Sequence, residues 1–182
     1  PTPLRGAPRP YLADAVMTEL AFTFSPQTDA DHAAIERLTE HAFGPGRFAK
    51  TAYRLREGRP ADHALSFVAR IGTILVGANR MTPIRIGDQP ALLLGPLVVE
   101  PAFRQHGLGE KLVNKSLEAA RAAGHRLVIL VGDPAYYGRM GFTRVPDGRM
   151  KMPGPVDPDR LQYYELAAGA LAAASGPIWR AD

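Results

Sequence analysis

The chain has 182 residues, a formal net charge of +4 at pH 7, 46% hydrophobic and 22% charged residues, and no cysteine. This length suits one domain with its own core, and the composition is that of a globular protein. The absence of cysteine excludes disulfides, thiolate metal sites and a cysteine nucleophile. The basic residues are scattered without a run of five, so we expect no nucleic-acid partner.

Residues 1–16, PTPLRGAPRPYLADAV, are rich in proline and show no period, and Met17 opens a more regular sequence. We therefore expect an N-terminal extension over 1–16, native or not, and a single domain over 17–182. No apolar run is long enough to span a bilayer, and the first residues lack the apolar segment of a signal peptide. A cytoplasmic protein without a membrane partner is expected.

The first part of this domain predicts one strand followed by two helices. The segment LAFTF (20–24) alternates weakly between apolar and polar residues, which favours a strand. A helix is predicted from a cap at Thr28 or Asp29 to about Phe43, where a GPG sequence ends it. Residues 48–57 form a second helical pattern.

The centre of the chain predicts a hairpin and then a strand–helix–strand unit. The hairpin turns near Gly72, and the next strand, Ala91–Glu100, is almost entirely apolar, as expected when both faces are buried. Residues 107–123 carry a helical apolar stripe that a glycine ends. Because residues 126–131, RLVILV, form another buried strand after this helix, the crossover predicts a parallel pair. A further strand is expected near 161–166.

The sequence RQHGLG (104–109) places a positive charge and two glycines where the strand meets the helix. One interpretation is simply a tight turn. The dinucleotide-binding fingerprint would need glycine where Leu112 stands, and the phosphate loop GxxxxGK[ST] is absent. The other interpretation is an anion site. Helix N-termini present free N–H groups, Gly107 and Gly109 let a ligand approach the backbone, and Arg104 adds a charge.

The segment LVVEPAFRQHGLGEKLVNKSLEAARAAG resembles the pattern V-x-P-x-x-R/Q-x-x-G-x-G/A of the GNAT superfamily of acyl-CoA N-acyltransferases. Downstream, DPAYYGRMGF (133–142) resembles the Y-x-x-x-G-F that follows the next strand in these enzymes. The paired tyrosines and LLLGPLVV look most like the YhbS-type branch. The resemblance covers roughly residues 18–180, with specific motifs in 92–142. It implies an α/β fold (an α+β mixed sheet) whose central, mostly antiparallel sheet has one splayed parallel strand pair and flanking helices.

The resemblance also implies acetyl-CoA as co-substrate and no metal. The pantetheine arm would pair with the backbone of residues 97–99, and the pyrophosphate would meet the amides of residues 105–110. His106 is expected to contribute its backbone rather than its ring. The cofactor-binding residues implied in this way are Leu97, Val98, Val99, Arg104, Gln105, His106, Gly107, Leu108, Gly109 and Glu110.

Tyr137 falls on the tyrosine that the family places near the thioester sulfur, which implies a catalytic role. A phenol keeps its proton at neutral pH and can give it to a leaving thiolate. The alternative is a tyrosine that only packs beneath Gly141-Phe142. Tyr136 is expected to pack, and Asp133 to cap a short helix at Pro134.

The sequence assigns no general base. The strand before Tyr137 has no ionisable side chain at the position where some relatives carry a glutamate. Glu100, Asp62 and His63 are candidates, although each is also typical of an ordinary surface residue. The five histidines form no HExxH pair, and no G-x-S-x-G occurs, so neither a metal nor a serine acyl-enzyme is expected. Direct transfer in a ternary complex is the mechanism that remains.

The expected function is transfer of an acetyl group from acetyl-CoA to an amine of a small molecule, peptide or protein. A CoA-binding regulatory or interaction module without catalysis is the alternative, because no base is assigned. A nucleic-acid binder has no support, since no basic stripe with interleaved aromatic residues occurs. Residues 41–50 and Asn79, Arg80 and Thr82 are candidates for the acceptor cleft, although their types select no acceptor. A homodimer is expected from the resemblance alone.

Overall fold

A nine-stranded mixed sheet forms the centre of the computed structural model, which describes residues 20–182. The predicted extension over residues 1–16 and Met17 lie outside the described residues. The main order is β1-β2-β3-β4-β5-β8-β6, and β9 pairs with both β3 and β7. The strands are β1 (Phe22–Pro26), β2 (Phe67–Ile71), β3 (Ile74–Ile86), β4 (Gln89–Val99), β5 (Leu127–Val131), β6 (Thr143–Arg144), β7 (Met150–Lys151), β8 (Leu161–Glu165) and β9 (Gly176–Arg180).

The sheet is mostly antiparallel, and β4 and β5 form the parallel pair that the crossover predicts. A second parallel pairing, not predicted, joins the two-residue strand β7 to β9. The helices are α1 (His32–Phe43), α2 (Thr51–Arg56), α3 (Leu108–Ala122), α4 (Pro134–Gly138) and α5 (Ala170–Ala173), with short 3₁₀ helices η1 (Asp29–Asp31), η2 (Pro45–Ala49), η3 (Pro101–His106) and η4 (Pro158–Arg160).

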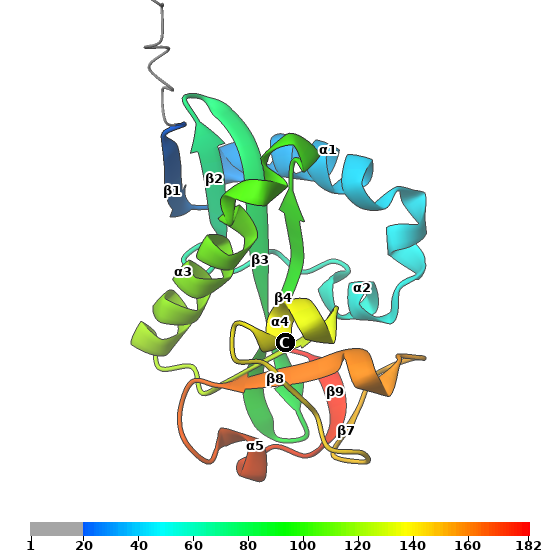
Figure 1. Cartoon of the computed structure of the whole chain (residues 1–182). Coiled ribbons are helices and arrows are strands. Elements are labelled where there is room, and N and C mark those ends of the chain that lie inside the picture. The colour runs from blue at the N-terminus through cyan, green and yellow to red at the C-terminus, as the bar shows by residue number, and fades with distance from the viewer. Residues whose placement is uncertain (1–19) are drawn as a thin grey trace, which may run out of the picture.

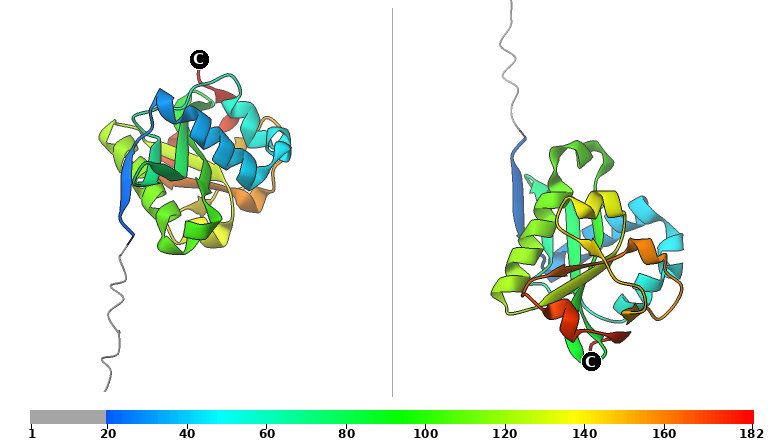
Figure 2. Two further views of the ribbon diagram at one scale, coloured as in Figure 1. Left: turned by 90° about the horizontal axis from the view of Figure 1, so that it is seen from above. Right: turned by 60° about the horizontal axis from the view of Figure 1, so that its bottom comes forward.

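The two long helices cover opposite faces of the sheet (Figures 1 and 2). In α1, Leu38 packs against Val68 of β2, whereas Leu112 of α3 packs in a cluster with Ala69. Val68 and Ala69 are neighbours in one strand, so their side chains point to opposite faces. The sheet is therefore buried on both sides, as the apolar composition of β4 predicts.

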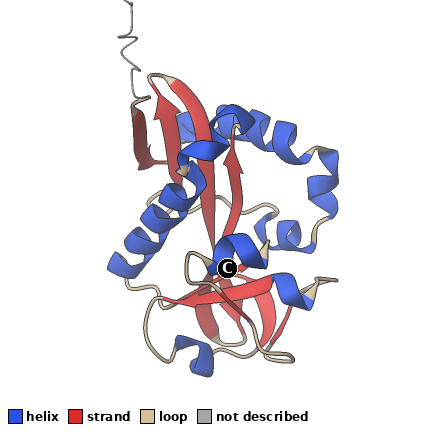
Figure 3. Cartoon of the chain, in the orientation of Figure 1, coloured by secondary structure: helices blue, strands red, loops and turns tan. Residues whose placement is uncertain are grey.

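A second apolar core lies at the opposite end of β3, where the last strand closes the sheet. Ile84 and Ile86 of β3 are buried together with Ile129 of β5 and Ile178 of β9. Figure 3 shows the strands of this lower half as a continuation of the sheet, with α2 and α5 beside it. The alanine- and glycine-rich segment before β9 gave no periodic signal, so neither α5 nor β9 is predicted from the sequence.

Several predicted elements differ in their bounds from the structure, among them the first strand and the second helix. The first strand begins at Phe22 rather than Leu20, and it extends to Pro26. The helix predicted over residues 48–57 is divided into η2 and α2, because Lys50 adopts an extended conformation with φ −71° and ψ 136°. The chain changes direction at this break, between η2 and α2.

Candidate active site

A cleft opens where the parallel strands separate. The backbones of β4 and β5 pair only at Leu92–Val128 and Leu93–Ile129. Beyond Leu93, β4 continues beside β3 while β5 continues beside β8. The β5-facing edge of residues 94–99 therefore has no strand partner, and a cavity of about 1410 Å³ lies against it.

A bulge in β4 marks the point where the strand leaves β5. In the pairing with β3, Leu94 stands opposite Met81 and Leu97 opposite Asn79, so two residues of β4 share the space opposite Arg80. The first of them, Gly95, has a φ of +114°, which a residue with a side chain rarely adopts. Bulges of this kind bend a strand and commonly occur next to active sites.

The N-terminus of α3 lies at the other end of this open edge. Gly107, the N-cap residue, has φ +68°, and no side chain caps the helix. The first amides of an α-helix have no carbonyl partner within the helix, so they are available to an anion. A Cβ at Gly107 would meet no atom within 4 Å, which leaves the space in front of the tip open.

The predicted cofactor residues divide into two groups. The cavity is lined by Leu97, Val98, Val99, Arg104 and Gly109. The remaining five, Gln105, His106, Gly107, Leu108 and Glu110, do not line it. Leu108 is fully buried and holds the helix on the sheet, and the ring of His106 lies 5.3 Å from that of Phe22. Gly107 and Leu108 can therefore offer only their backbone to a ligand at the helix tip, whereas the side chains of Gln105, His106 and Glu110 are exposed outside the cavity.

Gly109 lies directly beneath a tyrosine of α4. A Cβ at position 109 would overlap the hydroxyl of Tyr136, so glycine at this position lets the Tyr136 side chain pack against the helix tip. Tyr136 also packs edge-on against Tyr137, with ring centroids 5.0 Å apart, and lines the cavity itself. The packing role predicted for Tyr136 is thus observed, at a position beside the helix tip.

Tyr137 projects from α4 into the cavity and also packs against Phe142, at a centroid distance of 5.9 Å. The position of Tyr137 therefore suits both the packing role beneath Gly141-Phe142 and the catalytic role implied by the resemblance. Burial raises the pKa of the Tyr137 hydroxyl well above its ordinary value, and the neighbouring Tyr136 adds to this effect. The nearby cations Arg56 and Arg160 act in the opposite direction. The phenol is fully protonated at neutral pH.

The short helix α4 is capped as predicted. The carboxylate of Asp133 accepts a hydrogen bond from the backbone N–H of Ala135 at 3.1 Å, and Pro134 occupies the first helical position. Both features stabilise a helix N-terminus. Because α4 is only five residues long, this cap helps to hold Tyr137 in the cavity.

A family comparison agrees with this geometry. The model of the acetyltransferase (GNAT) family matches residues 30–142, which include the splayed strands, the helix tip and Tyr137. The chain belongs to the GNAT acetyltransferase family. The predicted family and enzyme class are confirmed.

The relatives of this GNAT chain include two curated proteins from Escherichia coli strain K12, both described as uncharacterized N-acetyltransferases. YhbS is 27% identical over 150 residues, covering 81% of this chain and 89% of YhbS. YjhQ is 32% identical over 130 residues, covering 69% of this chain and 72% of YjhQ.

Two solved structures share the GNAT fold. The Escherichia coli YhbS structure, in complex with CoA, has a TM-score of 0.77 at 24% identity and covers 90% of this chain and 91% of that one. A GNAT acetyltransferase from Brucella melitensis in complex with acetyl-CoA has a TM-score of 0.58 at 26% identity, over 80% of this chain and 97% of that one. The predicted fold and the YhbS-type branch are confirmed.

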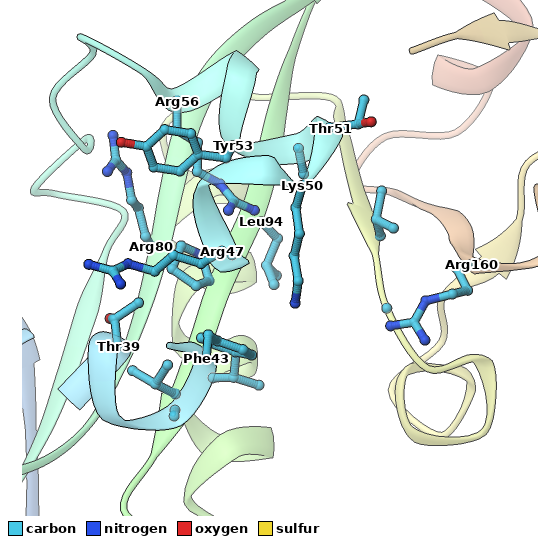
Figure 4. A pocket seen from close by; sticks show the side chains of 18 of the residues that line it. Thr39, Phe43, Arg47, Lys50, Thr51, Tyr53, Arg56, Arg80, Leu94 and Arg160 are labelled. Carbon is cyan, nitrogen blue, oxygen red and sulfur yellow. The ribbon is translucent and has the colours of Figure 1, made fainter. Parts of the chain in front are cut away.

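The wall opposite the helix tip is formed by α1, η2 and α2 of the GNAT chain (Figure 4). Of the predicted acceptor residues, Arg80 lines the cavity, together with Ala42, Phe43, Arg47 and Lys50 from the segment 41–50. Asn79 and Thr82 do not line it. The Nδ2 of Asn79 donates to Ser116 Oγ at 2.9 Å, and Thr82 is fully buried.

Two of the arginines that line the cavity, Arg56 and Arg160, are not singled out by the sequence. Arg56 lies at the end of α2, within the sequence RLREGR, and Arg160 lies at the end of η4, within DPDR. Neither segment has a motif, so only the fold brings the two arginines to one cavity. The neighbouring Arg54 and Arg59 also line the cavity, and no local sequence signal distinguishes any of these arginines from surface residues.

None of the three candidate bases lines the main cavity. Asp62 accepts a hydrogen bond from the N–H of Ala64 at 3.1 Å within its own turn. His63 lies 3.6 Å from the carboxylate of Asp29 and lines a separate cavity of about 230 Å³. Glu100 follows β4 and is half-buried outside the cavity. The general base therefore stays without an assignment.

Within residues 20–182, no group of three or more histidine, aspartate or glutamate side chains is arranged to hold a metal ion. In the same part of the chain, every helix is too short or too polar to cross a lipid bilayer.

Proposed function

We propose that this GNAT protein transfers an acetyl group from acetyl-CoA to an amine by direct attack in a ternary complex. The observation that carries the proposal is the unpaired edge of β4, residues 94–99, which runs from the bulge at Gly95 to the uncapped tip of α3. An extended ligand with amides at one end and phosphates at the other matches both features.

Acetyl-CoA is proposed to make two sets of contacts with the protein at the same time. The amide groups of its pantetheine arm would hydrogen-bond to the open backbone of residues 97–99, as an added strand does. Its pyrophosphate would meet the first amides of α3, with the side chain of Arg104 beside them. The helix dipole alone contributes only ~0.3–1 kcal/mol per anion, so direct N–H bonds and the arginine supply the rest. The Brucella melitensis relative with bound acetyl-CoA supports this assignment.

In the proposed reaction, the nitrogen of the amine attacks the thioester carbonyl carbon, the C–S bond breaks, and the sulfur receives a proton. The bulge at Gly95 leaves backbone groups of β4 unpaired beside the cavity, where they can stabilise the negative charge developing on the carbonyl oxygen. The buried hydroxyl of Tyr137 remains protonated and donates to the departing sulfur, and the proton that the attacking nitrogen loses as it becomes the amide restores the phenol. The products are the amide and the free thiol of CoA.

The attacking amine must be neutral. For an amine with a pKa of ~10.4, deprotonation at pH 7 costs about 5 kcal/mol, at 1.36 kcal/mol per pKa unit. Cations close to the bound amine lower its pKa and reduce this cost. Arg56 and Arg80 line the cavity on the side formed by α1, η2 and α2, so their charge lowers the cost of releasing the extra proton of the amine to solvent.

Isothermal titration calorimetry with acetyl-CoA tests the donor site. Arg104→Glu is expected to weaken binding by about tenfold or more, because a negative charge then stands beside two phosphates. Lys115→Glu is the matched control, since Lys115 lies over the ring of Phe24 at 5.6 Å, outside the cavity. Equal effects of the two substitutions at one ionic strength would argue against the pyrophosphate assignment.

Release of the CoA thiol with a panel of amines tests the transfer step. Tyr137→Phe is expected to lower turnover while leaving acetyl-CoA affinity nearly unchanged, because the ring and its packing are retained. An unaltered turnover would remove the proposed acid. Because none of Glu100, Asp62 and His63 lines the cavity, the alternative is a CoA-binding module without catalysis, and binding of acetyl-CoA without thiol release from any amine would favour it.

A further inference from the structure

Arg56 occupies an unusual position in the floor of the cavity. Its guanidinium lies against the β4 bulge, with Nη2 3.0 Å from the point that a Cβ on Gly95 would occupy. Its Nε is buried and has no hydrogen-bond partner. No ion pair to Arg56 is present within residues 20–182. The side chain as a whole is half-buried, but a buried N–H without an acceptor and a cation without a counter-ion are both unfavourable, and such groups are normally paired.

A second arginine increases this cost rather than relieving it. Burial and, to a smaller extent, the positive charge of Arg80 together lower the pKa of Arg56 from 12.5 to about 10. Arg80 is itself partly satisfied, since its Nε donates to Thr82 Oγ1 at 3.1 Å and its Nη2 to the carbonyl of Arg59. The two guanidiniums therefore share a region where an anion would be stabilised by both.

The whole cavity is rich in positive charge. In Figure 4, Lys50 and Arg160 reach into it from opposite walls. Two of the cavity's cations have carboxylate partners, Arg47 with Glu36 at 3.9 Å and Arg59 with Asp182 at 3.6 Å. The basic lining residues are Arg47, Lys50, Arg54, Arg56, Arg59, Arg80, Arg104 and Arg160, and the acidic ones are Glu36, Glu57, Asp133 and Asp157.

The position of Arg56 separates it from the proposed phosphate site. Arg104 and the tip of α3 follow Val99, whereas Arg56 contacts Gly95, four residues earlier in β4. At ~3.3 Å per residue, the two ends of this edge are about 13 Å apart. Arg56 also lies close enough to Tyr137 to influence its pKa. The unpaired guanidinium thus stands at the proposed reaction centre, on the acceptor side.

We propose that the acceptor is an amine that carries an oxyanion, a carboxylate or a phosphate, and that Arg56, assisted by Arg80, binds this group. The proposal rests on the acetyl transfer proposed above and names the class of its acceptor. A guanidinium presents paired N–H groups that match two oxygens of a carboxylate or phosphate. Binding at the bulge would place the amine of a small acceptor beside the thioester.

The test measures binding of product analogues to the CoA-saturated protein, so that it does not depend on turnover. Each probe is paired with a neutral partner: N-acetylglycine with its carboxamide, N-acetylglutamate with its diamide, and N-acetylated phosphoethanolamine with N-acetylethanolamine. For at least one pair, the oxyanion member is expected to bind about tenfold more tightly or better. The pair in which the oxyanion member binds more tightly shows whether the site prefers a carboxylate or a phosphate.

Two substitutions of Arg56 and one control substitution test the role of this arginine. Arg56→Met is expected to remove the preference for the oxyanion member, and Arg56→Lys to retain part of it, because the charge remains without the paired N–H groups. Arg37→Met is the matched control, since Arg37 is exposed on α1 and does not line the cavity. CoA affinity of all three is expected to stay within about twofold of the original protein, because Arg56 stands away from the phosphate site.

The outcomes separate this inference from the function on which it rests. Failure to bind CoA overturns the proposed function. Binding of CoA together with equal affinity within every pair, or with no measurable affinity for any oxyanion probe, overturns the acceptor class alone. A preference that persists in Arg56→Met also overturns it, because another residue would then hold the anion.

Discussion

Replacing Arg56 by methionine is expected to make the ligand-free protein more stable. The Arg56 side chain is half-buried against Gly95, its Nε is buried and unpaired, and no carboxylate of residues 20–182 pairs with it, so its charge opposes folding. Methionine has a similar unbranched stem and fills irregular space well, which retains most of the packing. The substitution therefore removes an unfavourable charge while losing few apolar contacts.

The magnitude follows from the pKa of Arg56. Folding lowers it from 12.5 to about 10, mainly because burial disfavours the charged form. At 1.36 kcal/mol per unit, this is about 3 kcal/mol, an upper limit because water in the cavity screens the charge. A gain of ~1–3 kcal/mol corresponds to a rise in Tm of roughly 3–8 °C for a chain of this size.

The pH dependence has a definite sign. Below pH about 10, Arg56 is protonated in both the folded and the unfolded chain, so the destabilisation is present in full. As the pH rises through 10, the folded state loses the proton first and the penalty is relieved. The stability difference between Arg56→Met and the original chain is therefore expected to be constant from pH 6 to 9 and to shrink above that.

Thermal unfolding followed by circular dichroism, at low salt and without CoA or acceptor, measures this effect. Arg37→Met on exposed α1 is the control and is expected to change Tm by less than about 1 °C. A lowered Tm for Arg56→Met, of the size seen for ordinary core substitutions, would refute the reasoning. It would mean that the guanidinium has a stabilising partner in the folded protein.

Three further predictions concern the helix tip and its support. Gly109→Ala is expected to lower the urea midpoint because its Cβ overlaps the Tyr136 hydroxyl, and Tyr136→Phe in the same chain should restore most of the loss; strictly additive effects would contradict the contact. Asp133→Ala is expected to destabilise by ~0.5–2 kcal/mol, whereas Asp133→Ser should be nearly neutral, so equal losses in denaturant melts would exclude capping. Leu112→Ala, at a fully buried position of α3, is expected to cost ~2–5 kcal/mol in the same melts, and a loss below 1 kcal/mol would show that the helix does not depend on this contact.

The part of the fold predicted from the sequence is the part with strong local patterns. The strand Ala91–Glu100, the helix over 107–123 and the strand over 126–131 are each long and regular, and their order determines the parallel pairing. The strand β9 was not predicted because its residues, GPIWR, have little pattern of their own. It is a strand because β3 offers Ile84–Ile86 as partners, which is a tertiary effect.

The candidate site divides in the same way. The glycine junction and Tyr137 stand in local motifs, so their positions along the cavity could be anticipated. Arg56 could not, because its significance depends on being buried without a partner beside a bulge in a distant strand. The absence of a counter-ion is a property of the folded arrangement, and no window of sequence reports it.

The bulge at Gly95 and Pro96 has a consequence for the protein without bound acetyl-CoA. An exposed strand edge is a template on which a foreign chain can add itself, and this is a common route to aggregation. Proline has no N–H to offer, and a bulge interrupts the regular spacing that a second strand would need. A flexible thioester arm can still follow the irregular edge, whereas a neighbouring polypeptide finds no continuous ladder. The irregular edge of β4 that shapes the slot would thus also prevent the ligand-free protein from pairing with strands of other proteins.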